Sequence, residues 1–143
     1  MVLGREANMQ IEKQVCSLEL SKELKECGYS QEGIWWIYNK LISKYSLTCA
    51  LTQCIIDHPE SWEYFIAPSV AELGEILPSE IDLGAGIDDK IYHLNCSKIN
   101  QSLYTIGYLN RREKVTVLAH TEADTEANAR AKMYIYLQKE GLI

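Results

Sequence analysis

Three side chains that commonly bind metals lie close together in the sequence. Cys49, Cys54 and His58 offer thiol and imidazole ligands of the kind that hold zinc. A structural zinc site requires four ligands, usually from two closely spaced pairs, and the second pair is missing here. Cys96 and His93 would supply it only if the fold brought them near. We therefore expect buried apolar cysteines at these positions rather than a metal site.

Two other chemistries are alternatives to the zinc site. A cysteine nucleophile needs a histidine base and a group that orients it, and the three histidines stand isolated in the sequence. The acidic pairs Asp88–Asp89 and Glu122–Asp124 offer oxygen ligands for a divalent cation. Glu122 and Asp124 are better explained as residues at the start of a helix. We expect no catalytic, cofactor-binding or metal-binding residues.

Aromatic side chains are the remaining candidates for a binding surface. Rings on a sheet bind single-stranded nucleic acid when basic residues accompany them. This chain is acidic, with a net charge of −6 and a pI near 5.1, so we do not expect nucleic acid as a partner. Core packing is the first interpretation and an exposed patch for a protein partner the second. The aromatic set comprises Trp35, Trp36, Trp62, Tyr64, Tyr104, Tyr108, Tyr134 and Tyr136.

Length and composition indicate a globular protein that needs no metal or disulfide for stability. The 143 residues suit one domain, and the hydrophobic fraction of 47% and charged fraction of 24% are ordinary. No apolar run is long enough to cross a bilayer, and no signal segment opens the chain. The five irregularly spaced cysteines indicate reduced thiols in the cytoplasm. We expect a flexible leader over 1–14 and a single α+β domain over 15–143.

Two helices are predicted by their start and stop signals. The first covers 17–27, with Ser17 as N-cap, one apolar stripe, and Gly28 as a left-handed stop. A shorter helix over 70–77 follows a capping box and ends at Pro78.

The last helix carries the clearest signals. It begins near Asp124 or Thr125 and ends before Gly141. Its apolar residues form two stripes on opposite sides, so the helix should be buried on both. One stripe should pack on a sheet, and the other on the first helix or on another subunit. The first stripe is Ala127, Ala131, Tyr134 and Ile135, and the second is Ala129, Met133, Tyr136 and Leu137.

Strand signals occupy both halves of the chain. Alternation and turn composition predict strands over 34–39, 90–94, 103–109 and 115–119. The last three follow one another through short connections, which indicates an antiparallel meander with a turn through Asn110 and Arg111. Residues 40–66 are harder to interpret. There we predict a short strand over 52–56 and a strand or loop over 62–67.

Three segments resemble small proteins carried by bacteriophages, prophages and related mobile elements, and the order of elements resembles the phage ABA-sandwich domain. The segments read CSLELSKELKECGYSQEG, APSVAELGEILPSEI and EADTEANARAKMYIYLQKEGLI. The resemblance implies a mobile-element context and helices layered on a small antiparallel sheet. It implies no activity, because it includes no catalytic motif.

We expect an α+β fold, with an antiparallel sheet of about four strands packed with the N- and C-terminal helices, plus one short middle helix. The expected function is that of a non-enzymatic accessory protein of phage or mobile-element origin that contacts proteins, either itself or a host protein. Two alternatives remain open. One is a small metal-dependent hydrolase or nuclease that uses Asp88, Asp89 or the Cys49–His58 region. The other is an acidic nucleic-acid mimic that inhibits a host factor.

Overall fold

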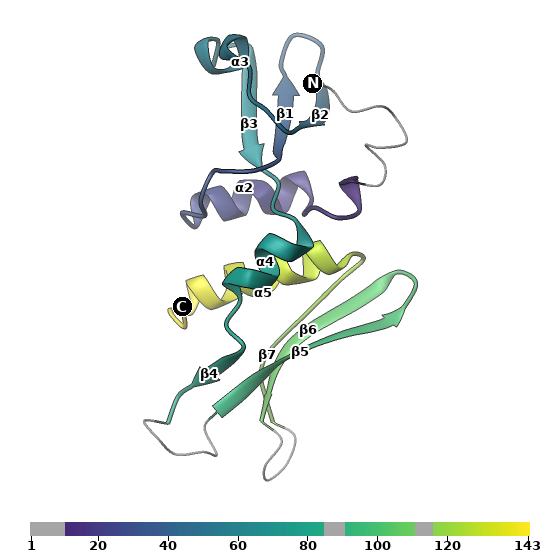
Figure 1. Cartoon of the computed structure of the whole chain (residues 1–143), viewed down its shortest axis with the longest axis vertical. Helices are drawn as coiled ribbons and strands as arrows, with labels where there is room; N and C mark the ends of the chain where they lie inside the picture. Colours follow the sequence, from purple (N-terminus) through teal and green to yellow (C-terminus); the bar gives the residue numbers. More distant parts are fainter. Residues whose placement is uncertain (1–10, 85–90, 111–115) are drawn as a thin grey trace. The chain divides into compact units, whose positions relative to one another are not determined.

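The chain combines helices with two antiparallel sheets (Figure 1). A computed structural model describes residues 11–84, 91–110 and 116–143, which form four helices, one sheet of three strands and one of four. This confirms the α+β fold class. The chain divides into two compact units, Met1–Ser69 (unit 1) and Val70–Ile143 (unit 2), each with its own sheet. The single domain over 15–143 stays a prediction.

Unit 1, in its described part, contains the three-stranded sheet and two helices. The strand order is β2-β1-β3, and the central strand β1 pairs antiparallel with both neighbours. Helix α2 packs against β3, so the N-terminal helix finds a sheet partner within unit 1. The elements are α2 (Leu18–Glu26), β1 (Trp35–Asn39), β2 (Lys44–Thr48), α3 (Gln53–Asp57) and β3 (Trp62–Ile66).

Helix α2 begins and ends as its sequence predicts. Ser17 is the N-cap, and its hydroxyl accepts a hydrogen bond from the Leu20 amide at 3.4 Å. Gly28 follows the helix with φ +79°, a left-handed conformation that glycine adopts without steric cost. Leu20 and Leu24 are buried, as the apolar stripe requires.

The predicted leader over 1–14 lies partly outside the described residues, which begin at Ile11. From there the chain makes a turn in which the Val15 amide donates to the Ile11 carbonyl oxygen at 3.1 Å. Ile11 also packs against a small core formed by Val15, Leu47 and Ala67. The last residues of the predicted leader are therefore attached to unit 1.

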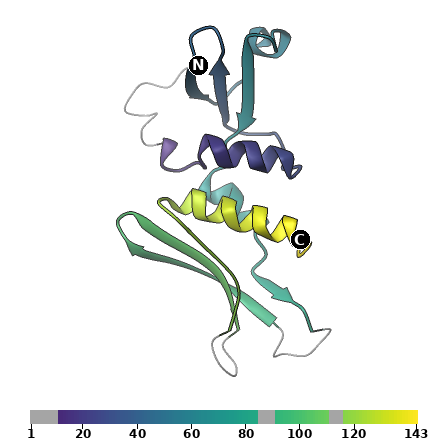
Figure 2. The ribbon, with the colours of Figure 1, turned by 180° about the vertical axis from the view of Figure 1, so that it is seen from behind.

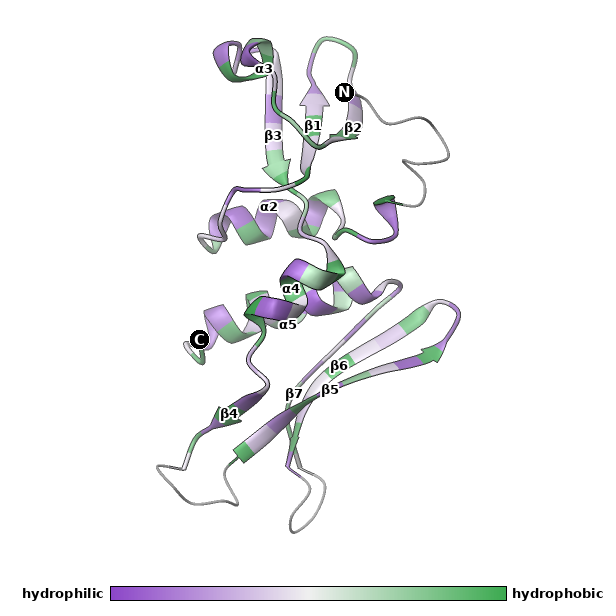
Figure 3. Cartoon of the chain, in the orientation of Figure 1, coloured by the Kyte–Doolittle hydropathy of each residue, from purple (hydrophilic) through white to green (hydrophobic). Residues whose placement is uncertain are grey.

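Residues 40–66 contain one wrong prediction and one strand that was not predicted. The strand expected over 52–56 is wrong, because these residues enter α3, which buries Ile55. The unpredicted strand is β2, which forms a hairpin with β1 (Figure 3). At the hairpin end Leu41 is 79% exposed and Ile42 59% exposed, and Ser43 has φ +51°. Of the segment 62–67, expected to be a strand or a loop, Trp62–Ile66 form strand β3.

Unit 2 is a four-stranded antiparallel sheet with helix α5 packed on one face and helix α4 packed on α5 (Figure 2). The strand order is β4-β5-β6-β7, so neighbours in sequence are neighbours in the sheet, as the meander prediction requires. The elements are α4 (Val70–Ile76), β4 (Glu80–Asp82), β5 (Ile91–Asn100), β6 (Leu103–Asn110), β7 (Thr116–Ala123) and α5 (Glu126–Lys139).

The core of unit 2 lies between α5 and the sheet. Ile106 and Tyr108 point into it from β6, and one predicted stripe of α5 meets them. The buried members of this core are Leu77, Ile81, Ile106, Tyr108, Ala119, Ala123, Ala129, Met133 and Leu137. The other stripe is also buried at Ala127, Ala131 and Ile135. The helix is thus buried on two sides except at Tyr136, which belongs to the second predicted stripe and is exposed. Its packing on the first helix stays a prediction.

The ends of the unit 2 elements differ in part from the predictions. Helix α5 begins at Glu126, close to the predicted start near Asp124 or Thr125. Thr125 is its N-cap, and the Thr125 hydroxyl accepts from the Asn128 amide at 3.2 Å. Strand β5 continues to Asn100, six residues beyond the predicted end. Asn110, expected in a turn, is the last residue of β6 and pairs with Thr116. The rest of that turn, like Asp88 and Asp89, lies outside the described residues.

Candidate functional site

The three predicted zinc ligands do not form a site in unit 1. Cys49 follows β2 and Cys54 lies on α3, and both are exposed, so the expectation that they are buried is wrong. His58 ends α3, and its Nδ1 lies 2.9 Å from Oε1 of Glu60. Among the residues that the structure describes, no group of three or more His, Cys, Asp or Glu side chains could hold a metal ion.

The acidic and imidazole groups of unit 2 have structural partners. Asp124 lies one residue before the N-cap of α5, and its carboxylate accepts from Nδ2 of Asn128 at 2.9 Å, in line with its predicted place at a helix start. Glu122 lies on β7, 3.9 Å from His120, so its predicted place at the start of a helix is wrong. His93 lies on β5, 3.7 Å from Glu80. These pairs are exposed, and water screens exposed ion pairs strongly.

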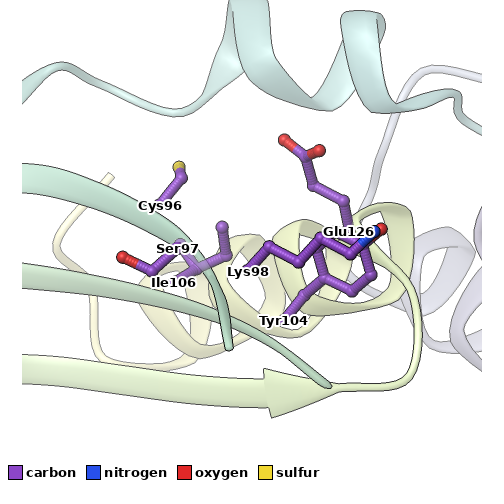
Figure 4. A pocket seen from close by; sticks show the side chains of 6 residues that line it. All are labelled: Cys96, Ser97, Lys98, Tyr104, Ile106 and Glu126. Atoms are coloured by element: carbon purple, nitrogen blue, oxygen red, sulfur yellow. The ribbon is translucent and has the colours of Figure 1, made fainter. Parts of the chain in front are cut away.

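A small pocket of about 100 Å³ lies beside Cys96, between the β5–β6 hairpin and the start of α5 (Figure 4). Its lining comprises Cys96, Ser97, Lys98, Tyr104, Ile106 and Glu126. Burial raises the pKa of the Cys96 thiol, Arg130 opposes that rise and Glu126 adds to it. A nucleophilic cysteine needs the opposite shift, because the thiolate is the reactive form. Cys96 is itself exposed, contrary to the expectation of a buried cysteine, and the direction of its pKa shift does not favour the thiolate.

A larger groove follows strand β3 in unit 1. Its volume is about 370 Å³, and seven residues line it: Lys25, Lys40, Pro59, Trp62, Glu63, Tyr64 and Phe65. We call it the β3 groove. Lys25 comes from α2, Lys40 follows β1, and the others belong to β3 or the turn before it. A helix and an outer strand thus bound the β3 groove.

The pairing of β1 with β3 decides which amide and carbonyl groups of β3 point away from β1, toward the outer edge of the sheet. The Lys40 amide donates to the Ser61 carbonyl at 2.9 Å, and the Ala67 amide donates to the Ile34 carbonyl at 2.7 Å. In an antiparallel ladder the direction of the backbone groups alternates from residue to residue. Trp62, Tyr64 and Ile66 therefore direct their amide and carbonyl groups away from β1.

Two of these three outward amides already have partners. The Trp62 amide donates to the His58 carbonyl oxygen at 3.0 Å, and the Ile66 amide donates to Oε1 of Gln31 at 3.3 Å. For the amide and carbonyl of Tyr64, the described part of the chain supplies no hydrogen-bond partner. The middle of the β3 edge is therefore open to a backbone from elsewhere.

Lysines and aromatic rings surround this open position. Lys25 Nζ lies 5.1 Å from the centroid of the Phe65 ring and 5.5 Å from that of Tyr64, within cation–π range. Lys22 Nζ lies 5.5 Å from the Phe65 centroid. Lys40 Nζ is held instead by the Glu63 carboxylate at 3.4 Å and the Pro59 carbonyl at 3.1 Å.

The sequence identifies two of the three rings of this groove, but neither Phe65 nor the groove itself. Trp62 and Tyr64 belong to the aromatic set, for which the acidic net charge argued against accompanying basic residues. Lys25 reaches the groove from a helix almost forty positions earlier in the chain. The spacing of Lys22 and Lys25, three apart on one face of α2, was the available signal. Only the strand order shows that β3 is an outer strand.

Comparisons of the chain with protein-family models, with curated proteins and with solved structures find no match. The resemblance to phage proteins and to the ABA-sandwich domain therefore stays a prediction. Among the described helices, none has the length and apolar character needed to cross a membrane.

Proposed function

We propose that the chain is a binding protein that takes up an extended segment of a partner protein along the outer edge of β3. The observation that carries this proposal is the outward amide and carbonyl of Tyr64, which lie unbonded among the described residues in the middle of the β3 groove. The proposal gives a specific form to the expected protein–protein contact. The sequence resemblance supports the further proposal that the protein is a non-enzymatic accessory protein of a mobile element.

Addition of a strand to an open sheet edge is a general mode of peptide recognition. Main-chain hydrogen bonds supply affinity, and alternate side chains of the peptide contact the surrounding surface. Here Tyr64 would donate one hydrogen bond and accept another. The amides of Trp62 and Ile66 are already engaged, so the added strand is short.

The test begins with the full chain on an array of random octapeptides, followed by a titration with the best-bound peptide. Tyr64→Pro removes the outward amide. It breaks no hydrogen bond to β1, because that amide points away from β1, and proline is tolerated at such edge positions. Tyr64→Ala removes the same ring but keeps the amide. We expect Tyr64→Pro to weaken binding at least about fivefold more than Tyr64→Ala, which corresponds to one net hydrogen bond of about 1 kcal/mol.

Hydrogen exchange followed by NMR gives a second readout. In the complex the Tyr64 amide should exchange more slowly than in the unbound chain, because it becomes hydrogen-bonded. If no peptide binds, or if a bound peptide leaves the exchange rate of the Tyr64 amide unchanged, strand addition at β3 is wrong.

A further inference from the structure

From the charges around the β3 groove we infer that its occupant is an acidic extended segment, in which a carboxylate side chain next to the residue paired with Tyr64 binds Lys25. This inference rests on the proposed function, because it names the chemistry of the partner at the same site. Its basis is the arrangement of three lysines around an edge strand in an otherwise acidic chain.

The groove has the opposite sign of charge from the whole molecule. Two lysines and one glutamate line it, a net charge of +1, whereas the chain carries −6. A third lysine, Lys22, lies beside it over the Phe65 ring. Complementary charge steers association and disfavours partners of the wrong sign. A basic peptide would meet Lys25 at close range, and its approach would be opposed.

The two lining lysines have different partners. The Lys40 ammonium contacts the Glu63 carboxylate and the Pro59 carbonyl, so its charge is largely satisfied within the chain. Lys25 contacts only the faces of two rings, and the described residues give it no carboxylate partner. A lysine ammonium has three N–H donors, and for Lys25 the described residues supply no carboxylate or carbonyl oxygen to accept from them. Lys25 is thus the group that can accept a carboxylate from outside.

The position of Lys25 also locates the carboxylate along the peptide. Its Nζ lies between the rings of Tyr64 and Phe65, at one side of the open backbone position. A peptide residue that pairs with Tyr64 places its neighbours about 3.3 Å further along the edge. An acidic side chain at one of these neighbouring positions reaches Lys25, whereas one several residues away does not.

The experiment uses the full chain and three octapeptide arrays. The arrays are identical except at one set of positions, which carries Glu in the first array, Gln in the second and Lys in the third. We expect Glu peptides to dominate among the binders. The best Glu peptide is then remade with single Glu→Gln changes, and one change should weaken binding about two- to fivefold, the range of an ion pair at an exposed site. Its affinity should also fall as the salt concentration rises from about 50 to about 500 mM.

Lys25→Glu provides the variant test, and Lys44→Glu is its matched control. Lys44 is an exposed lysine on β2, the strand at the opposite edge of the same sheet. Both variants change the net charge equally. Lys25→Glu should weaken the Glu peptide about tenfold and improve binding of its Lys counterpart, whereas Lys44→Glu should change both affinities by less than about twofold.

The outcomes separate this inference from the proposed function. Binding of all three charge classes with equal affinity, together with slowed exchange at the Tyr64 amide, overturns the acidic occupant and leaves strand addition intact. Equal losses from Lys25→Glu and Lys44→Glu show an effect of net charge alone and also overturn it. Failure of every peptide class to bind contradicts the proposed function itself.

Discussion

At the scale of single residues, tyrosine side chains contribute both to the core of unit 2 and to the β3 groove. Tyr108 is fully buried in unit 2, and its hydroxyl donates to the Pro78 carbonyl oxygen at 2.7 Å. Tyr64 in unit 1 is only half-buried, and its ring meets Trp35 edge to face at 5.5 Å. Both rings belong to the aromatic set of the sequence, so residue type alone does not separate a core ring from a surface one.

Tyr108 should make the protein sensitive to alkaline pH. Burial chiefly raises the pKa of Tyr108 to about 12. Since the folded pKa exceeds that of an unfolded tyrosine, near 10, the folded state holds the phenolic proton more tightly. Its contribution to the free energy of unfolding is therefore complete below about pH 10 and is lost as the pH rises to about 12. We expect a fall of roughly 1–2 kcal/mol across that window, measured by urea unfolding.

Tyr108→Phe tests this assignment. The variant should lose about 1 kcal/mol at pH 7, because the Pro78 carbonyl loses its donor, and should show a shallower loss between about pH 10 and 12. Tyr136→Phe, at a residue that is 38% exposed, should stay within about 0.5 kcal/mol of the parent at pH 7. An unchanged alkaline slope in Tyr108→Phe would assign the titration to another group.

At the scale of elements, local signals fix the helices better than the strands. Helices α2, α4 and α5 carry their caps and stops within their own segments, and the sequence locates them closely. Strand β5 runs on through NCSKIN, which has no apolar alternation, because pairing with β6 stabilises it. The sequence predicts a strand where the short helix α3 lies because the Ile-Ile pair favours β structure locally. The helix instead buries Ile55.

The β3 groove illustrates the same limit. The aromatic composition of 62–67 indicates a strand or a packed loop, but a sequence does not say which edge of a strand remains without a neighbour. That depends on the order β2-β1-β3 and on α2, which brings Lys25 to the groove. Both depend on packing between segments that are distant in the chain. Two rings of the site, Trp62 and Tyr64, could thus be named from the sequence, whereas Phe65, the lysines and the open backbone could not.

The N-caps of α5 and α3 allow a comparison at this scale. The Thr125 hydroxyl accepts from the Asn128 amide, whereas Thr52, the N-cap of α3, makes no such side-chain hydrogen bond. Thr125→Ala should therefore lower the free energy of unfolding by about 1 kcal/mol, and Thr52→Ala by much less. Urea unfolding followed by far-UV circular dichroism measures both. Equal losses would mean that the cap of α5 contributes nothing specific.

At the scale of the whole molecule, the question is whether two compact units behave as one domain. All three tryptophans, Trp35, Trp36 and Trp62, lie in unit 1, whereas α5 lies in unit 2. Tryptophan fluorescence therefore reports on unit 1, and the exchange of α5 amides reports on unit 2. The chain thus carries a separate probe for each unit.

Met133→Ala tests the single-domain prediction over 15–143. Met133 is fully buried in the core of unit 2, so its truncation should cost about 2–5 kcal/mol. If the chain unfolds as one domain, the tryptophan transition and the α5 amides must be destabilised by the same amount. A loss confined to the α5 amides, with an unchanged fluorescence midpoint, would replace the single domain by two.

The open position at Tyr64 has a cost as well as a use. A backbone that can accept a foreign segment can equally template a second copy of its own strand, and such contacts between edges begin aggregation. Charged side chains beside an edge commonly act as gatekeepers against that growth. Lys25 and Lys40, which lie at this edge, would then have a second role in opposing aggregation. Because salt screens their charges, the protein should precipitate first when it is stored at high protein and salt concentration.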